Sequence, residues 1–185
     1  MTYLERLQEA LSRTSFGNTL SYEENMISIR AIFQRVREKN RTLYFIGNGG
    51  SAGIAVHMTS DFLKNACVKT HSMHDPATLT CLANDFEYSF VFSKQLEHVA
   101  EEGDLLVAIS SSGESENILQ AALAGRKKRC KVLTLTGFRE TNRLRKMGDD
   151  NIYVPSMEYG IVETIHNLIL QQIVDEIAAQ DKKRM

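Results

Sequence analysis

Two short loops rich in glycine and serine are the places where this sequence could do chemistry. The first is GNGGS at residues 47–51 and the second is SSSGES at residues 110–115, and each follows an apolar run and precedes a helical pattern. Glycines let a backbone approach a ligand closely, and the N–H groups that begin a helix point outward at the positive end of its dipole. Serine hydroxyls donate further hydrogen bonds without adding charge. Both loops therefore predict binding of an anion.

A phosphorylated small molecule fits these loops better than a nucleotide does. The first loop lacks the lysine of a P-loop, and its glycine spacing is not that of a dinucleotide fingerprint with an acid about twenty residues on. Helix capping alone would explain Ser115, but it does not explain the run Ser110–Ser112 before a glycine. We therefore expect no nucleotide cofactor.

The elements that must position these loops follow the rhythm of a doubly wound α/β fold, in which short apolar runs alternate with helical stretches. The predicted strands are Thr42–Ile46, roughly Val68–Ser72, Leu105–Ser110, Lys131–Thr136 and Asn151–Val154. The predicted helices are Ser51–Ala66, a capped turn near Asp75 and Pro76, Tyr88–Ala100, Ser115–Lys127, Thr141–Lys146 and about Tyr159–Gln180. In such a mainly parallel five-stranded sheet, ligands bind beyond the carboxyl ends of the strands, where both loops lie.

An N-terminal helical extension precedes the sheet, and a long C-terminal helix follows it. Tyr3, Leu7 and Leu11 share one helical face, and the chain breaks near Gly17 and Asn18. A capping box of Ser21 and Glu24 opens a second helix. Its apolar seam is Tyr22, Met26, Ile29, Phe33 and Val36, and the stripe of the last helix is Ile161, Ile165, Ile169, Ile173 and Ile177. The seam could serve a partner subunit as readily as the chain's own core, so we expect residues 1–40 to serve oligomerisation too.

Composition limits the class of protein. With 185 residues, 43% hydrophobic and 24% charged, the chain fits one domain over residues 1–185. A net charge of -1 gives no field that would attract nucleic acid or a membrane surface. Cys67, Cys81 and Cys130 form no CxxC pair, and no segment has the length needed to span a bilayer. We expect a cytoplasmic protein with a small ligand.

The stretches GNGGSA, AISSSGES and LTLTG resemble the sugar isomerase (SIS) domain, in its phosphoheptose isomerase branch. The resemblance extends through LTCLANDFEYSFVFSKQLEHVAEEGDLLVAISSSGESENIL and covers about residues 20–177. It implies a cytoplasmic homotetramer with active sites completed between subunits. It also implies interconversion of sedoheptulose 7-phosphate and a heptose 7-phosphate, for surface polysaccharides such as lipopolysaccharide or capsule.

The resemblance also implies roles for individual residues. Asn48, Gly49, Gly50 and Ser51 would contact the sugar phosphate and its hydroxyls, and Ser110, Ser111, Ser112 and Ser115 would hold the phosphate, with Asp85 nearby. Asp61 stands where the family usually has a glutamate base, one turn after His57. On the last helix, alignment on His166 puts Glu163 at the family's glutamine and Gln171 at its second histidine. Gln171 could contact substrate, but its amide cannot shuttle a proton.

Two outcomes follow from Gln171. In the first, proton transfer uses Asp61 together with Glu163 or His166, and His57, Asp61, Glu163 and His166 supply four ligands to one divalent metal, for which zinc is suited. In the second, catalysis is lost, and the protein is a SIS module that senses a sugar phosphate or docks a protein. We favour the isomerase. His71, His74 and His98 are interpreted as structural or exposed.

Overall fold

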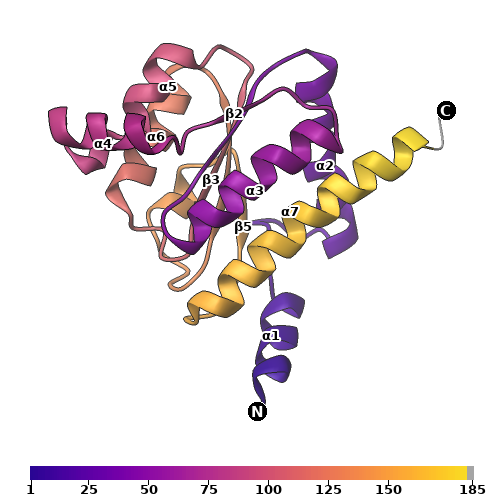
Figure 1. The fold of residues 1–185 in the computed structure, drawn as a ribbon. Coiled ribbons are helices and arrows are strands. Elements are labelled where there is room, and N and C mark those ends of the chain that lie inside the picture. The colour runs from indigo at the N-terminus through magenta and orange to yellow at the C-terminus, as the bar shows by residue number, and fades with distance from the viewer. Residues whose placement is uncertain (183–185) are drawn as a thin grey trace.

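The computed structural model describes residues 1–182, whose strands form one parallel sheet in the order β2-β1-β3-β4-β5 (Figure 1). The strands are β1 (Leu43–Ile46), β2 (Thr70–Ser72), β3 (Leu105–Ser110), β4 (Lys131–Thr136) and β5 (Asp150–Tyr153). The predicted fold class is confirmed, with parallel pairing at every neighbouring pair of strands. Residues 183–185, the last three of the predicted domain, lie outside the described residues.

The register of the central strands brings the two loops together. Strands β1 and β3 are buried along their whole length, as expected of parallel strands covered on both faces. Ile46, the last residue of β1, pairs with Ala108 in β3. The loops that follow therefore leave the sheet side by side, at its carboxyl edge.

Helices cover both faces of the sheet (Figure 1). The hydrophobic cluster on one face receives side chains from α2 (Tyr22–Glu38), α3 (Gly50–Lys64) and α7 (Tyr159–Lys182). The cluster on the other face is built with α5 (Ser93–Val99) and α6 (Glu116–Lys127), and α4 (Pro76–Asp85) lies at its rim. Helix α1 (Tyr3–Ser12) contacts α7 and projects from the body of the molecule (Figure 1).

The N-terminal extension packs largely on its own chain. The capping box of Ser21 and Glu24 is present. Within the predicted seam, Met26, Ile29, Phe33 and Val36 are buried, and the Phe33 ring stacks on that of Phe62 with centroids 4.7 Å apart (the α7 stripe is buried as well). A partner subunit would therefore have to use other apolar side chains than this seam.

Three predicted elements differ from the structure because of local backbone bonding. The predicted helix Tyr88–Ala100 is a 3₁₀ turn, η1 (Tyr88–Phe90), followed by α5. The predicted helix Thr141–Lys146 is only a turn, η2 (Leu144–Lys146), because the Asn142 amide bonds the backbone at Gly137, Arg139 and Arg145 instead. Strand β2 starts two residues late, since the Val68 N–H still bonds the carbonyl of Phe62 at the end of α3.

Membrane insertion of a helix finds no support in residues 1–182, because none of their helices is at once long and apolar enough to cross a bilayer. The cysteines Cys67, Cys81 and Cys130 are all free thiols. Their wide spacing in the sequence agrees with this arrangement.

Candidate functional site

A cavity of about 390 Å³ lies between the two loops at the carboxyl edge of the sheet. Its lining consists of Asn48, Gly49, Gly50, Ser51, Ile109, Ser110, Ser111, Ser112, Ser115, Tyr159 and Glu163. All eight loop residues expected to bind the ligand are thus in one place, together with Glu163. Their roles in binding stay predictions, but the geometry they require is present.

The first loop turns sharply so that the start of α3 faces the cavity. Gly49 occupies the left-handed region at φ +55° and precedes the helix without a side-chain cap. The N–H of Ala52 bonds back to the carbonyls of Asn48 and Gly49, so the N–H groups of Gly50 and Ser51 are the ones that a ligand can use. A Cβ on Gly47 would lie 2.5 Å from the Ser51 carbonyl oxygen, so only glycine fits where the loop folds back on itself.

His74 holds the backbone of the first loop. Its Nε2 lies 3.1 Å from the Gly47 carbonyl oxygen, and burial lowers the pKa of His74. The neutral ring donates this hydrogen bond from Nε2. His74 thus has a structural role beside the cavity, and it is not one of the residues that line it.

The second loop offers a buried hydroxyl that has no partner. The Ser111 side chain is 4% exposed, and its Oγ makes no hydrogen bond in the structure. Ser115 is the N-cap residue of α6 but makes no side-chain capping bond, so capping does not account for Ser115 either, contrary to the expectation from the sequence. A buried polar group without a partner costs free energy, commonly about 1–3 kcal/mol. An oxygen of a ligand in the cavity would remove that cost.

The loop between β4 and β5 supports the second loop from behind. Gly113 has φ +66°, and its Cβ position is already filled by the Asn142 side chain. Leu144 donates its N–H to the Gly113 carbonyl at 3.0 Å, and the Arg143 N–H donates to Glu114 Oε1 at the same distance. Asn142 was not foreseen from the sequence, although an asparagine in the turn-rich stretch 137–142 is a signal of backbone bonding.

Glu163 brings the carboxylate of the site. It stands on the first turns of α7 and packs directly on Gly50, where a Cβ would overlap its carboxyl group. Among the described residues that line the cavity, the titratable side chains are Glu163 and Tyr159. The cavity thus combines hydrogen-bond donors at the two loops with one carboxylate at its wall.

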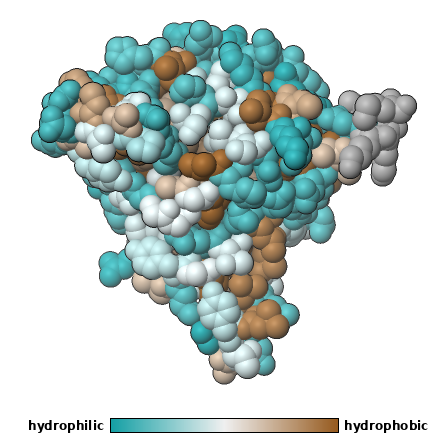
Figure 2. All heavy atoms as spheres, in the orientation of Figure 1, coloured by the Kyte–Doolittle hydropathy of each residue, from teal (hydrophilic) through white to brown (hydrophobic). Residues whose placement is uncertain are grey.

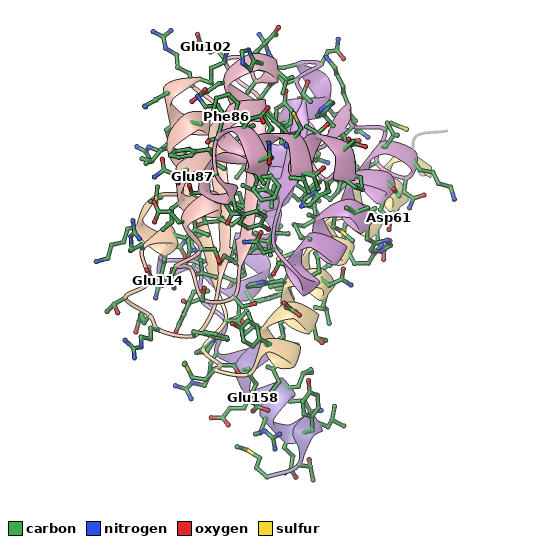
Figure 3. All side chains as sticks on the ribbon, turned by 60° about the vertical axis from the view of Figure 1, so that its left-hand side comes forward. Asp61, Phe86, Glu87, Glu102, Glu114 and Glu158 are labelled. Atoms are coloured by element: carbon green, nitrogen blue, oxygen red, sulfur yellow. The ribbon has the colours of Figure 1, made fainter. Side chains whose placement is uncertain are left out.

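Besides His166, four predicted site residues lie outside this cavity in their own chain. His57 Nε2 and Asp61 Oδ2 are 3.6 Å apart on the outer side of α3, and Figure 3 shows Asp61 on the opposite side of the molecule from Glu114. Asp85 is exposed at the end of α4 and accepts a hydrogen bond from Asn84. Gln171 donates to Asp175 along α7.

The predicted zinc ligands do not come together within the chain. Among residues 1–182, no group of three or more His, Cys, Asp and Glu side chains is placed to hold a metal ion. His57 and Asp61 face outward, whereas His166 is fully buried with Nε2 3.1 Å from the Thr136 carbonyl oxygen. The proposed set of His57, Asp61, Glu163 and His166 therefore does not fit a metal here, and His166 does not reach the cavity as a proton-transfer group.

The buried His166 predicts a specific dependence of stability on pH. Burial lowers the pKa of His166 to about 4 from 6.5. As the pH falls from 6.5 to 4, the unfolded chain takes up a proton that the folded chain refuses, so this group removes about 3 kcal/mol of stability. We expect the free energy of unfolding of His166→Gln, measured with urea, to lack this loss between pH 6.5 and pH 4. The glutamine amide can still donate to Thr136 but does not titrate. Parallel pH profiles for the two proteins would contradict the assignment.

Two asparagines and a tyrosine join the loops, and sequence reasoning missed two of the three. The Asn48 and Asn117 side chains exchange two amide hydrogen bonds of 2.9 Å each. The Tyr88 hydroxyl donates to Asn48 Oδ1, also at 2.9 Å. Asn117 stands in the first turn of α6 and is 3% exposed, and a polar residue in that apolar helix face was the one available signal.

Comparison with known families matches residues 3–137 to the SIS domain. The phosphoheptose isomerase of a Nitratiruptor species is 32% identical over 164 residues, which is 84% of each chain. That of Cytophaga hutchinsonii is 33% identical over 181 residues, covering 91% of this chain and 94% of its own.

Solved structures give the same result. The phosphoheptose isomerase of Francisella tularensis superposes with a TM-score of 0.84 at 27% identity, covering 96% of this chain and 95% of its own. The enzyme GmhA of Neisseria gonorrhoeae superposes with a TM-score of 0.83 at 26% identity, covering 95% and 92%. Since sequence and fold agree over most of the length, the chain belongs to the SIS-domain family and, within it, to the phosphoheptose isomerases.

Proposed function

We propose that this protein isomerises sedoheptulose 7-phosphate to a heptose 7-phosphate. One observation carries the proposal: a cavity whose wall holds an unpartnered buried hydroxyl, Ser111, on one side and a carboxylate, Glu163, on the other. Binding of a phosphorylated sugar with proton transfer near its carbonyl needs both groups. The relatives' names, phosphoheptose isomerase, supply the substrate class, and the family resemblance supplies sedoheptulose 7-phosphate as the ketose.

The phosphate is best accommodated by the second loop. The hydroxyls of Ser110, Ser111, Ser112 and Ser115 line that side of the cavity, and the amide end of α6 adds its dipole. None of these donors carries a full charge, so the phosphate is held by geometry more than by net attraction. The carbonyl end of the sugar then extends toward Gly50 and Glu163.

Glu163 is our candidate for the proton-transfer group. Its carboxylate takes a proton from C1 of the ketose while the electrons of that bond form an enediolate whose negative charge rests on O2. The protonated carboxyl then delivers a proton to C2, and the O1 proton passes to O2, which leaves the aldehyde at C1. The proton held by the carboxyl exchanges with solvent before delivery, so in D₂O deuterium enters at C2. A correctly placed acid or base contributes about 10²- to 10⁴-fold to such a step. The predicted zinc ligands do not come together, so this reaction scheme contains no metal ion.

Isomerase assays in D₂O test this function directly. The protein is incubated with sedoheptulose 7-phosphate, with and without zinc, and product and deuterium incorporation are followed by NMR. We expect the aldose to form and deuterium to enter at C2. Tight binding of the sugar phosphate with neither turnover nor exchange would favour the non-catalytic binding module over the isomerase.

We further propose that the protein acts as a homo-oligomer, with a tetramer as the expected form. His57, Asp61 and Gln171 lie outside their own cavity, beside apolar side chains that remain exposed: Val56 at 44%, Leu63 at 58% and Leu168 at 40%. Figure 2 shows such hydrophobic side chains scattered among hydrophilic ones on this side of the molecule. A groove of about 650 Å³ also runs along α7 beside Gln171. A second copy on α3 and α7 would cover these groups.

The assembly can be tested with charges placed on this face. Leu63→Glu combined with Leu168→Glu is expected to raise the dissociation constant of the oligomer about tenfold or more, since a charge would be buried at each contact. Leu123→Glu on α6, 44% exposed on the other side of the sheet, is the matched control. Sedimentation velocity at micromolar concentration measures all three proteins. A monomeric wild type, or equal effects of both changes, would count against the interface.

The cellular role that fits this reaction is supply of heptose precursors for surface polysaccharides, in the cytoplasm. The three free thiols are consistent with a reducing compartment. Whether the product enters lipopolysaccharide or capsule depends on enzymes that act later, and the cavity gives no preference between them.

A further inference from the structure

The side chain of Asn48 has nearly all of its hydrogen-bonding capacity occupied by protein groups. Its Oδ1 accepts from Asn117 Nδ2 and from the Tyr88 hydroxyl, each at 2.9 Å. A carbonyl oxygen has two lone pairs, so this acceptor is filled. One N–H of Asn48 Nδ2 donates to Asn117 Oδ1 at 2.9 Å. The second N–H of Asn48 Nδ2 is therefore the one group of this side chain left for a ligand in the cavity.

From this bonding pattern we infer that Asn117 and Tyr88 lock Asn48 as a hydrogen-bond donor aimed at an oxygen of the substrate. A free asparagine can turn its amide over and present either an acceptor or a donor. In the locked form Asn48 discriminates in favour of an acceptor, such as the ketose carbonyl or the enediolate oxygen that follows it. A donor placed at developing negative charge stabilises the transition state more than the ground state. This inference rests on the proposed isomerase function.

The segment that carries Tyr88 is built to hold this position. Glu87, the residue before it, has φ +114° and ψ 150°, a conformation that side-chain-bearing residues rarely adopt. Its carbonyl accepts the Phe90 N–H at 3.1 Å, which closes the turn η1. Figure 3 shows Phe86 and Glu87 close together on one side of the molecule. The strained turn is therefore consistent with a requirement for a fixed Tyr88.

The lock also couples the two loops. Asn48 belongs to the first loop, and Asn117 lies on the first turn of α6 directly after the second loop. Asn117 is 3% exposed, and its Nδ2 and Oδ1 are both used by Asn48. This pair of amides therefore sets the distance between the part of the site that binds the carbonyl end of the sugar and the part that binds its phosphate. Asn117 and Tyr88 act as positioning residues, and Asn48 is the group that touches the substrate.

Asn48→Asp removes the donor. The aspartate keeps the shape of Asn48, and both Asn117 Nδ2 and the Tyr88 hydroxyl can still donate to it, but Asn117 Oδ1 loses the N–H that it accepts, so the melting temperature should fall as well. The free N–H is lost, and kcat should fall about 10²- to 10³-fold, the usual effect of removing one such donor. Tyr88→Phe frees one lone pair of Asn48 and should lower kcat about tenfold with little change in KM. Tyr3→Phe, at an exposed tyrosine of α1, should change neither.

The measurements are kcat and KM for sedoheptulose 7-phosphate, together with calorimetric binding of that sugar and of inorganic phosphate. Wild-type kcat in Asn48→Asp would overturn the inference, and so would a Tyr88→Phe effect confined to melting temperature. If the wild type does not isomerise the sugar, the proposed function fails, and the inference about Asn48 is then tested by binding of the sugar phosphate alone. In that case Asn48→Asp should weaken sugar phosphate binding more than it weakens inorganic phosphate binding, and equal losses would reject the donor.

Discussion

Replacement of Glu163 by glutamine is expected to reduce kcat about 10²- to 10⁴-fold, with KM almost unchanged. Glutamine has the shape of glutamate and can occupy the same space on Gly50, so the cavity should keep its form. It cannot accept the proton from C1. The NMR assay should therefore show bound sugar, little product and little deuterium at C2.

A matched control is available at the same end of the molecule. Glu158 pairs with Arg6 at 2.8 Å in an exposed position and does not line the cavity (Figure 3). Glu158→Gln should leave kcat within about twofold of the wild type, because exposed ion pairs contribute little to stability. Equal activity of Glu163→Gln and the wild type would move the proton transfer to another group, with Asp61 of a second chain as the first candidate.

The largest effect on stability is expected from Gly47→Ala. The new Cβ would lie 2.5 Å from the carbonyl oxygen of Ser51 and 2.6 Å from its carbonyl carbon, both backbone atoms that cannot turn away. The first loop and the start of α3 must then shift, which we expect to cost about 3 kcal/mol. For a chain of this size the melting temperature should fall by roughly 6–12 °C. Thermal unfolding followed by circular dichroism measures this.

Gly53→Ala, in the helix that follows this loop, is the comparison. Nothing lies within 4 Å of the Cβ position at Gly53, which is in the interior of α3 and exposed. Alanine has the higher helix propensity, so this change should stabilise by about 0.5–1 kcal/mol. Opposite signs for the two substitutions are the expected result. A Gly47→Ala protein as stable as the wild type would mean that the loop is not held in the described turn.

Much of the fold could be predicted because the sheet follows hydrophobic patterning. The strands β1 and β3 are short apolar runs of the kind that buried parallel strands show, and the stripe of isoleucines on α7 recurs every four residues. Local hydrogen bonds explain two misplaced segments: the Asn142 side chain bonds the backbone around the predicted helix Thr141–Lys146, and the Val68 N–H bonds the Phe62 carbonyl before β2. Asn142 turns a helical pattern into a loop in this way, and periodicity carries no trace of it.

The candidate site shows the same contrast between residues that a sequence pattern reveals and residues that depend on individual contacts. The two loops that line the cavity could be found because their glycines and serines are unusual after a buried strand, and the topology of a parallel sheet brings such loops together. Glu163 was found only through the family resemblance. Asn117 and Tyr88 were missed because their partner, Asn48, is 69 and 40 residues away in the chain, and a single sequence does not reveal such pairs.

His166 shows the opposite error. An E-x-x-H pair on one helix was interpreted as two groups facing one site, yet Glu163 faces the cavity and His166 is buried against the end of β4. Residues three apart lie about 60° from each other around a helix, because one turn takes 3.6 residues. This angle is large enough that Glu163 lines the cavity while His166 lies in the core.

A crystal structure of the complex with sedoheptulose 7-phosphate tests the central claim most directly. We expect the phosphate within hydrogen-bond distance of Ser111 Oγ, and C1 and C2 of the sugar beside the Glu163 carboxylate and the Asn48 amide. A sugar phosphate bound elsewhere, or one in this cavity with its carbonyl end turned away from Glu163, would contradict the account.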